Sequence, residues 1–416
     1  MRIVQINTVY GEKSTGVIAR DIHGMLKASD IDSRVVCISS TEHSDNIIEL
    51  GYGIENKVHA LMTRLLGKQG FYSKGTTRSL LSTLDRDRPH IIHLHNVHSN
   101  FLNLPMLFEY AAKNNIPVMM TLHDCWFFTG KCYHFLDNGC DRWLTRCHDC
   151  PKRKAEIPSL LLDSSSSVFD KKRSMYASVE LHVVGCSRWV ADCAGRSPLF
   201  EGASFYQIYN GADKDTFSDK GGNLRDELSL GKATVIMTMA NKWFDPKNEA
   251  ARNEVLSYVK EKSAKLMIVG CGNDRLDAYA HDESVTCIGY ERDRSRMAAL
   301  YRTADAFLNL TFVDTLPTVN MESALCGTPV VTYDSGGSGE LVLDGLTGYV
   351  VEPLDISGLI ASLEKIRCGA IDRQTCRSFA ESTFDKNANY KKYLELYQKI
   401  YENRAEQNGK QNCIKK

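Results

Sequence analysis

Two acidic residues lie eight positions apart in the stretch TFVDTLPTVNMESALCGTPVVTYDSGGSGE, which begins at Thr311. Asp314 precedes a proline turn, and Glu322 lies inside an apolar segment that predicts a helix. Carboxylates accept hydrogen bonds from hydroxyl groups, and the first turn of a helix has backbone N–H groups without a partner. The pattern indicates either an acidic surface between two ordinary turns or a site that holds the hydroxyls of a sugar.

Two lysines offer the opposite charge. Lys242 and Lys247 flank a turn in the segment ANKWFDPKN, which follows a strand-like apolar run. Two cations in such a turn suit a diphosphate, whereas a lone lysine there is usually a solvated helix start. A nucleotide-sugar site needs cations and backbone amides that bind the phosphates, and carboxylates that bind the sugar hydroxyls.

Two features of the N-terminal half are candidates for the same chemistry. Gly16 belongs to the turn GEKSTG before a predicted helix, whose free N–H groups can bind an anion. His123 ends a strand-like run in TLHD, where it can donate to a sugar hydroxyl or a phosphate and change protonation near neutral pH. The alternatives are an ordinary helix start and a structural histidine whose hydrogen bonds are satisfied within the protein.

A cysteine-rich stretch covers residues 125–151, where it interrupts the alternation of strands and helices. Cys147-x-x-Cys150 has the spacing of zinc ligands, whereas Cys132 and Cys140 are further apart than a usual ligand pair. A structural zinc site at these four cysteines, free or buried thiols, and a disulfide all stay open.

The elements that position these residues follow from the hydrophobic pattern. Short β-branched runs alternate with amphipathic stretches, which predicts two doubly wound, Rossmann-like α/β domains with parallel sheets. A chain of 416 residues is also too long for one ordinary core. We predict an N-terminal domain over 1–212, a C-terminal domain over 213–385, and a helix with a tail over 386–416 that can pack back on the first domain.

The composition excludes some classes of function. The formal net charge is zero, which argues against nucleic-acid binding through a charged surface. The N-terminal segment MRIVQINTVYG resembles a first strand and not a signal peptide, and no apolar window is long enough for a membrane span. We therefore expect a cytoplasmic protein.

One segment is a candidate for contact with a membrane surface. Residues 57–78 contain five basic residues and no acid, interleaved with leucines and aromatic residues. Such a segment can lie on an anionic membrane surface, so that the protein is peripheral at the inner face of the cell membrane. The alternative is a solvated basic helix with a buried apolar seam.

The stretch DTLPTVNMESALCGTPVVTYDSGGSGE resembles the signature of retaining, nucleotide-sugar-dependent glycosyltransferases of the GT-B type, in family 4. More narrowly, it is similar to bacterial enzymes that build exopolysaccharide, colanic acid or O-antigen. The segments STGVIARDI, HIIHLHNVH, TLHDCWFFTGKC, GCSRWVADCA, IYNGADKDTF and ANKWFDPKN follow in the family's order. The resemblance covers nearly the whole chain and implies two Rossmann-like domains that face a cleft.

The resemblance implies separate roles for the site residues. Glu322 would accept hydrogen bonds from the ribose hydroxyls of the donor. Asp314 would hold hydroxyls of the donor sugar, with the backbone amides of Thr315 and Leu316 beside it. Lys247 would neutralise the diphosphate as it leaves.

The first domain would contribute Gly16, whose loop would approach the donor phosphates, and His123, which would contact the donor sugar near the reacting carbon. The chain departs from the family at two positions. Position 314 is an aspartate where much of the family has glutamate. Asn241 lies where the family often has an arginine, so either Lys242 supplies that charge or the diphosphate is held less strongly.

The activity that the resemblance implies is transfer of a sugar, with retention of configuration, from a UDP- or GDP-linked donor to a glycan acceptor. By family analogy the acceptor is lipid-linked and the product is a cell-surface polysaccharide. The sugar-binding loops contain no Asp-x-Asp arrangement, so we expect no catalytic metal. Two alternatives stay open: a non-catalytic nucleotide-sugar-binding component of a polysaccharide assembly complex, and a related GT-B epimerase.

Overall fold

The computed structural model describes the backbone of residues 1–414 and the side chains of residues 1–407. The last two residues of the predicted tail, 415–416, lie outside the described residues. The chain forms two compact units. The first contains residues 1–209 and the C-terminal helix from residue 389 onward, and the second contains residues 210–388.

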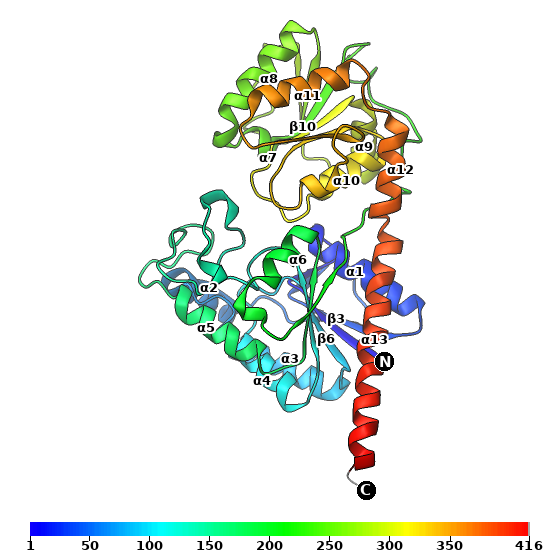
Figure 1. Ribbon diagram of the computed structural model, residues 1–416. Helices are drawn as coiled ribbons and strands as arrows, with labels where there is room; N and C mark the ends of the chain where they lie inside the picture. The colour runs from blue at the N-terminus through cyan, green and yellow to red at the C-terminus, as the bar shows by residue number, and fades with distance from the viewer. Residues whose placement is uncertain (415–416) are drawn as a thin grey trace. The chain divides into compact units, whose positions relative to one another are not determined.

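The first unit is built on a seven-stranded parallel sheet with the strand order β5-β3-β1-β6-β7-β8-β9 (Figure 1). Strands β6, β7 and β8 are buried along their whole length, so both faces of this part of the sheet are covered. Its strands are β1 (Arg2–Ile6), β3 (Asp32–Cys37), β5 (Ile47–Glu49), β6 (Ile91–Leu94), β7 (Val118–Leu122), β8 (Leu181–Gly185) and β9 (Ser204–Gln207). A two-stranded sheet adds β2 (Val9–Tyr10) and β4 (Ser39–Ser40).

The connections of the first unit are mostly helical, as parallel strands require. The helices are α1 (Lys13–Ala28), α2 (Ile54–Leu66), α3 (Lys74–Asp87), α4 (Leu104–Lys113), α5 (Ser165–Tyr176) and α6 (Arg188–Gly195), with short 3₁₀ turns at Leu136–Asn138, Arg142–Leu144 and Pro198–Phe200.

The C-terminal helix α13 (Lys386–Ile414) belongs to the core of the first unit, along which it runs in Figure 1. Its inward residues share one apolar cluster with Ile3 of β1 and Ile22 of α1. Two tyrosines also bond to the sheet: the Tyr397 hydroxyl lies 2.6 Å from His93 Nδ1, and the Tyr393 hydroxyl lies 3.1 Å from Thr121 Oγ1. The helix therefore closes the sheet of the first unit.

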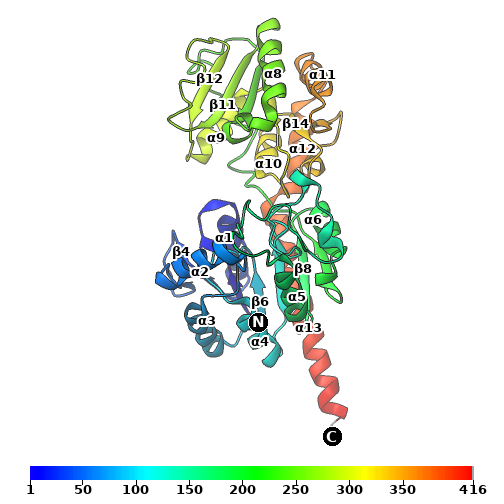
Figure 2. The same cartoon turned by 90° about the vertical axis from the view of Figure 1, so that its left-hand side faces the viewer.

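The second unit contains a six-stranded parallel sheet with the order β12-β11-β10-β13-β14-β15; Figure 2 shows β11 and β12 beside α8. The strands are β10 (Val235–Met239), β11 (Lys265–Cys271), β12 (Val285–Gly289), β13 (Ala306–Asn309), β14 (Val330–Tyr333) and β15 (Gly348–Val351). The helices are α7 (Ala240–Trp243), α8 (Glu249–Glu261), α9 (Arg294–Thr303), α10 (Thr318–Leu325), α11 (Ile356–Arg367) and α12 (Arg373–Phe384), with 3₁₀ turns at Pro246–Asn248 and Gly339–Leu341. The two parallel sheets confirm the predicted α/β class.

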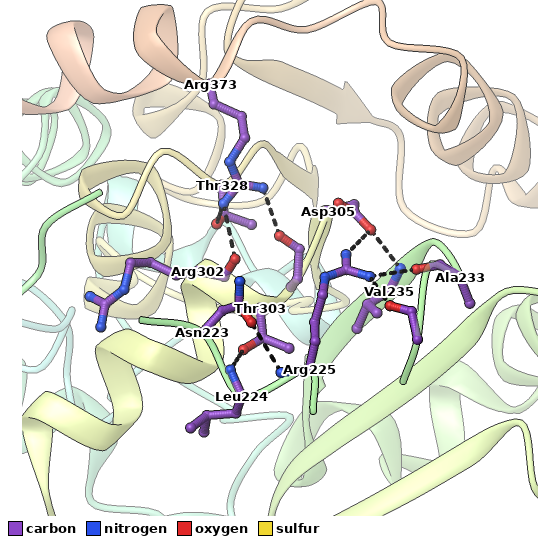
Figure 3. Close-up of polar contacts among 12 residues, drawn as sticks. Asn223, Leu224, Arg225, Ala233, Val235, Arg302, Thr303, Asp305, Thr328 and Arg373 are labelled. Atoms are coloured by element: carbon purple, nitrogen blue, oxygen red, sulfur yellow. Dashed lines mark hydrogen bonds and ion pairs between the residues drawn. The ribbon is translucent and has the colours of Figure 1, made fainter. Parts of the chain in front are cut away.

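The polar segment that leads into β10 is held on the second unit by charged and backbone groups (Figure 3). The Arg225 guanidinium donates to Asp305 Oδ2 at 2.7 Å and to the Ala233 carbonyl at 2.8 Å. The same Asp305 oxygen accepts the Val235 N–H at 2.8 Å. This network fixes where β10 begins, and hence where its carboxyl end delivers the next loop.

Among the described residues, none of the helices combines the length and the apolarity that crossing a bilayer demands.

The packing of α13 predicts a large loss of stability for Tyr393→Ala. Removing a fully buried aromatic side chain leaves a cavity and costs about 3–5 kcal/mol. Urea unfolding of the full chain, followed by tryptophan fluorescence, measures this loss because Trp126, Trp143 and Trp189 of the four tryptophans lie in the first unit. Tyr401→Ala, at an exposed position of the same helix, is the control and should cost about 1 kcal/mol or less. Equal losses in the two variants would show that α13 is not part of the core.

Candidate functional site

The candidate site lies at the carboxyl edge of the sheet in the second unit. Strands β10 and β13 are neighbours, while β11 and β12 continue from β10 in the opposite direction. The strand order therefore reverses between β10 and β13, which is where open α/β sheets bind ligands. Lys247 follows β10 and Asp314 follows β13, so the two predicted residues flank this point. A hollow of ≈ 730 Å³ in the same unit lies at the other edge, beside Lys265 where β11 begins.

Asn248 joins the two loops. Its side-chain amide donates to the Leu310 carbonyl at 2.8 Å and to the Lys242 carbonyl at 2.9 Å, and the residue is fully buried. One side chain thus fixes the loop that contains the lysines against the start of the loop that contains Asp314. The sequence analysis missed Asn248, because the pattern DPKN does not show which of its polar residues points inward.

The two hydrogen bonds of Asn248, called the clamp below, hold the loop that contains the two lysines. Lys247 is exposed, and its Nζ lies 5.7 Å from the centroid of the Phe312 ring, two residues before Asp314. Its backbone N–H donates to Asp245 Oδ1 at 3.0 Å, which orders the turn. Asn241 is exposed and Lys242 half-buried on the short helix α7. Neither lysine forms an ion pair with a described residue, so both cations are open to an anionic ligand.

The loop around Asp314 is held from two sides. The Leu316 N–H donates to Asp314 Oδ1 at 3.1 Å, and the Gly337 N–H donates to the Asp314 carbonyl at 3.1 Å. The Ser335 hydroxyl donates to the Phe312 carbonyl. The glycine loop after β14 therefore supports this loop, and the Leu316 amide orients the carboxylate. Thr315 and Leu316 are buried, whereas Asp314 is half-buried.

Glu322 lies on α10 with one carboxylate oxygen 3.3 Å from the hydroxyl of Tyr301 and the other 3.9 Å from the guanidinium of Arg294. Burial raises its pKa to about 7, although Arg294 and the Tyr301 hydrogen bond oppose this rise. A carboxyl group with such a pKa is close to half ionised at neutral pH. Strongly shifted carboxyl groups of this kind concentrate at functional sites.

In the first unit, Gly16 is explained by packing. A Cβ at this position would meet the Val9 carbonyl oxygen at 3.0 Å, so only glycine lets α1 lie this close to β2. Gly16 is buried, and its carbonyl accepts the Gly11 N–H at 3.1 Å. The residues of the first turn that face outward are Lys13 and Ser14.

His123, which is half-buried, is linked to the buried His95. Its Nε2 lies 3.2 Å from His95 Nδ1, and His95 Nε2 lies 3.0 Å from Gln5 Oε1. Because Gln5 Oε1 is an acceptor, His95 carries its proton on Nε2, so His123 donates to it. Burial lowers the pKa of His123 to about 4. The expectation that His123 changes protonation near neutral pH is therefore wrong: it is neutral there and can only exchange hydrogen bonds.

A cavity of ≈ 580 Å³ opens at the carboxyl edge of the first sheet, beside Gln69, His98, Asn100 and Tyr133. His98 and Tyr133 pack ring against ring with centroids 4.5 Å apart. His98 Nε2 lies 2.8 Å from Asp124 Oδ2. Burial would raise the pKa of Asp124, but His98 and the Trp126 N–H outweigh it, so the pKa is lowered and the carboxylate stays ionised. The sequence analysis quoted the segment of His98 but did not assign it a function.

A zinc site at the four cysteines, one of the alternatives, is not shown by the structure and stays a prediction. Within residues 1–407, no three His, Cys, Asp or Glu side chains gather so as to hold a metal ion, and these cysteines are free thiols. The thiols of Cys132 and Cys150 form a hydrogen bond with each other, and Cys147 Sγ accepts a hydrogen bond from the Gly130 N–H at 3.2 Å. Burial raises the pKa of Cys147 to about 11, whereas the hydrogen bond from Cys132 lowers the pKa of Cys150 to about 7.

Comparison with known proteins finds a family match within the second unit. Residues 237–367 match the family described as Glycosyl transferases group 1. The colanic acid biosynthesis glycosyl transferase WcaC, as it is named in Escherichia coli strain K12, is 25% identical over 96% of this chain and 100% of its own length. The UDP-Gal:alpha-D-GlcNAc-diphosphoundecaprenol alpha-1,3-galactosyltransferase of Escherichia coli is 23% identical over 46% of this chain and 53% of its own.

Solved structures establish the fold. Sucrose-phosphate synthase from Thermosynechococcus elongatus is similar over 96% of this chain and 99% of its own, with a TM-score of 0.68 and 14% identity. HepE of Anabaena in complex with UDP-glucose is similar over 96% and 100%, with a TM-score of 0.62 and 14% identity. Both units are Rossmann-like and the fold is GT-B, as the resemblance implied.

The raised pKa of Glu322 predicts how the second unit responds to pH. Between about pH 4.5 and 7 this residue ionises in the unfolded chain but stays protonated in the folded one. The folded state then binds the extra proton, so the unfolding free energy falls as pH rises through this window, by on the order of 3 kcal/mol. Glu322→Gln should remove this slope. Amide hydrogen exchange of β13 peptides at a series of pH values measures it.

The exposed Glu254→Gln on α8 is the matched control and should keep the wild-type slope. An identical pH dependence in wild type and Glu322→Gln would contradict the raised pKa.

Proposed function

We infer that the protein, whose residues 237–367 form a glycosyl transferases group 1 domain, transfers a sugar from a nucleotide-sugar donor to a glycan acceptor in cell-surface polysaccharide biosynthesis. The observation that supports this most directly is the clamped pair of loops at the strand-order reversal. It presents unpaired lysines on one side and a positioned aspartate on the other, the charges that a nucleotide diphosphate sugar requires.

The donor, UDP- or GDP-linked, would be held by its three parts. Lys247 and Lys242 would face the diphosphate. Lys242 would supply the positive charge of the arginine that the family often has at the position of Asn241. Asp314 would accept hydrogen bonds from the sugar hydroxyls. Glu322 would accept them from the ribose, and the ionised form suits this best, because both oxygens of a carboxylate only accept. The ordered loops make these groups available without rearrangement.

The transfer would proceed with retention by displacement on one face of the sugar. The bond between the anomeric carbon and the phosphate oxygen breaks, and the leaving phosphate takes the proton of the acceptor hydroxyl as the new glycosidic bond forms. Lys247 would stabilise the negative charge that develops on the phosphate. His123, neutral at pH 7, would supply hydrogen bonds and no charge.

The acceptor site would be the cavity of the first unit. Tyr133 offers a ring face on which a sugar can pack, and Gln69 and Asn100 offer side-chain amides for its hydroxyls. A relative is named for a diphosphoundecaprenol-linked acceptor, and we propose an acceptor of the same lipid-linked class. The protein would then work at the inner face of the cell membrane, with residues 57–78 near the anionic surface.

The competing proposal is a non-catalytic nucleotide-sugar-binding component, which the neutral, exposed Asn241 favours. Incubation with a panel of nucleotide sugars, with and without a lipid-linked acceptor, separates the two. Nucleotide release that depends on the acceptor supports transfer. Tight donor binding without release supports the binding component.

Removing the Glu322 carboxylate should weaken nucleotide binding. Each lost hydrogen bond to a charged group is worth about 1.5–3 kcal/mol, so Glu322→Ala should raise the Kd for the donor nucleotide about 10- to 150-fold. Isothermal titration calorimetry at pH 8, where the carboxylate is ionised, measures the change. Glu254→Ala, at an exposed position of the same unit, should bind as wild type does. An unchanged Kd for Glu322→Ala would remove it from the donor site.

Lys247→Ala should lower turnover more than donor affinity. A cation that acts on the leaving phosphate stabilises charge that exists fully only in the transition state. We expect kcat to fall by about 100-fold or more while the donor KM changes by less than about tenfold. Steady-state kinetics of nucleotide release tests this, with Lys260→Ala on α8 as the control. A rise in KM at unchanged kcat would assign Lys247 to binding alone.

A further inference from the structure

Helix α2 is packed with its polar face inward. The residues that it buries are Asn56, His59 and Thr63, all polar. Its outward stripe is apolar: Ile54 is 80% exposed, Val58 52% and Leu61 55%. A surface helix of a water-soluble protein normally shows the opposite arrangement.

The buried polar face is satisfied, which shows that the orientation of α2 is fixed. His59 accepts the Gly70 N–H at Nε2 at 3.1 Å and bonds Ser73 Oγ through Nδ1 at 2.7 Å. The Asn56 amide donates to the Asn100 carbonyl at 3.3 Å, and the Thr63 hydroxyl donates to Asn100 Oδ1 at 2.8 Å. Turning α2 to hide its apolar stripe would leave these groups without partners, at about 1–3 kcal/mol each.

A second segment extends the apolar stripe. The Leu160 N–H donates to the Arg64 carbonyl at 3.1 Å, and the Leu161 N–H donates to the Leu65 carbonyl at 2.9 Å, so this segment is tied to the end of α2. Leu160, Leu161 and Leu162 are all exposed. We call the set Ile54, Val58, Leu61, Leu160, Leu161 and Leu162 the apolar face. It lies on the first unit, where Figures 1 and 2 show α2 at the periphery.

The apolar face is accompanied by cations. Lys57, Arg64, Lys68 and Lys74 form no ion pair with a described residue. The single acid of α2, Glu55, is turned to α3, where it accepts the Gly75 and Thr76 N–H groups at 2.7 Å. Apolar side chains with unpaired cations beside them match the boundary between the acyl chains and the anionic headgroups of a bilayer.

We propose that the apolar face and these cations dock the protein on an anionic lipid bilayer, with the six side chains inserted among the acyl chains. The inference rests on the proposed function for the reason the protein visits a membrane, namely a lipid-linked acceptor. A second copy of this chain fits the surface less well, because a symmetric dimer would bring the same cations together.

The test is sedimentation of the full chain with vesicles of phosphatidylcholine, with or without phosphatidylglycerol. The wild type binds vesicles that contain phosphatidylglycerol more tightly than vesicles of phosphatidylcholine alone, and added salt weakens the binding. The variant Ile54→Gln/Val58→Gln/Leu61→Gln lowers the partition coefficient by about tenfold or more per side chain. Lys57→Gln/Arg64→Gln lowers it about 25-fold, since each cation near the surface contributes about 1 kcal/mol. Glutamine preserves helix propensity, so α2 stays folded.

The control variant is Tyr290→Gln/Leu346→Gln/Leu354→Gln, which removes three exposed apolar side chains from the second unit and should bind as wild type. Wild-type binding by the triple variant of α2, or no binding of wild type at low salt, overturns the proposal. It is also overturned if light scattering shows a wild-type dimer that the α2 variant converts to monomer. Nucleotide release without vesicles is measured in parallel, so that a failure of docking with normal release leaves the proposed function intact.

Discussion

The amide of Asn248 is the interaction on which the candidate site depends. It uses both of its N–H bonds to hold backbone carbonyls of two loops that are more than sixty residues apart in the chain. Parallel strands place both loops at one edge of the sheet, but loops are mobile, so the strands alone do not fix the positions of the loop residues. A fully buried amide restricts that freedom, because it holds one carbonyl of each loop at the same time.

Burial sets the charge of the groups around this clamp. Burial raises the pKa of Glu322 to about 7. In the first unit, burial lowers the pKa of His123 to about 4 and the pKa of His95 well below its usual value. The histidines therefore contribute hydrogen-bond geometry and no positive charge at neutral pH. In the proposed function, neutralisation of the donor phosphates would therefore fall to Lys247 and Lys242 and to the backbone N–H groups at the start of α10.

Much of the fold could be predicted from the sequence, because buried parallel strands produce uninterrupted apolar runs and the carboxyl-edge rule then places Lys247 near Asp314. What could not be predicted depends on which way a polar side chain points. Asn248 and Asn241 look alike in the sequence, yet one is fully buried and the other exposed. The spacing of Cys147 and Cys150 predicted zinc as one alternative, but spacing does not show which other side chains the fold brings beside them, and no group of three ligands forms within residues 1–407.

The same limit explains α2. Its hydrophobic period is that of any amphipathic helix, so the sequence predicts a buried apolar seam as readily as an exposed one. The difference comes from Asn100, which lies outside the helix and accepts hydrogen bonds from Asn56 and Thr63. Because these hydrogen bonds fix the polar face of α2 inward, the apolar stripe on the opposite face is exposed. Exposure of an apolar stripe to water is unfavourable, and such patches usually mark sites of interaction. The apolar stripe of α2 is therefore expected to contact an apolar partner outside the chain.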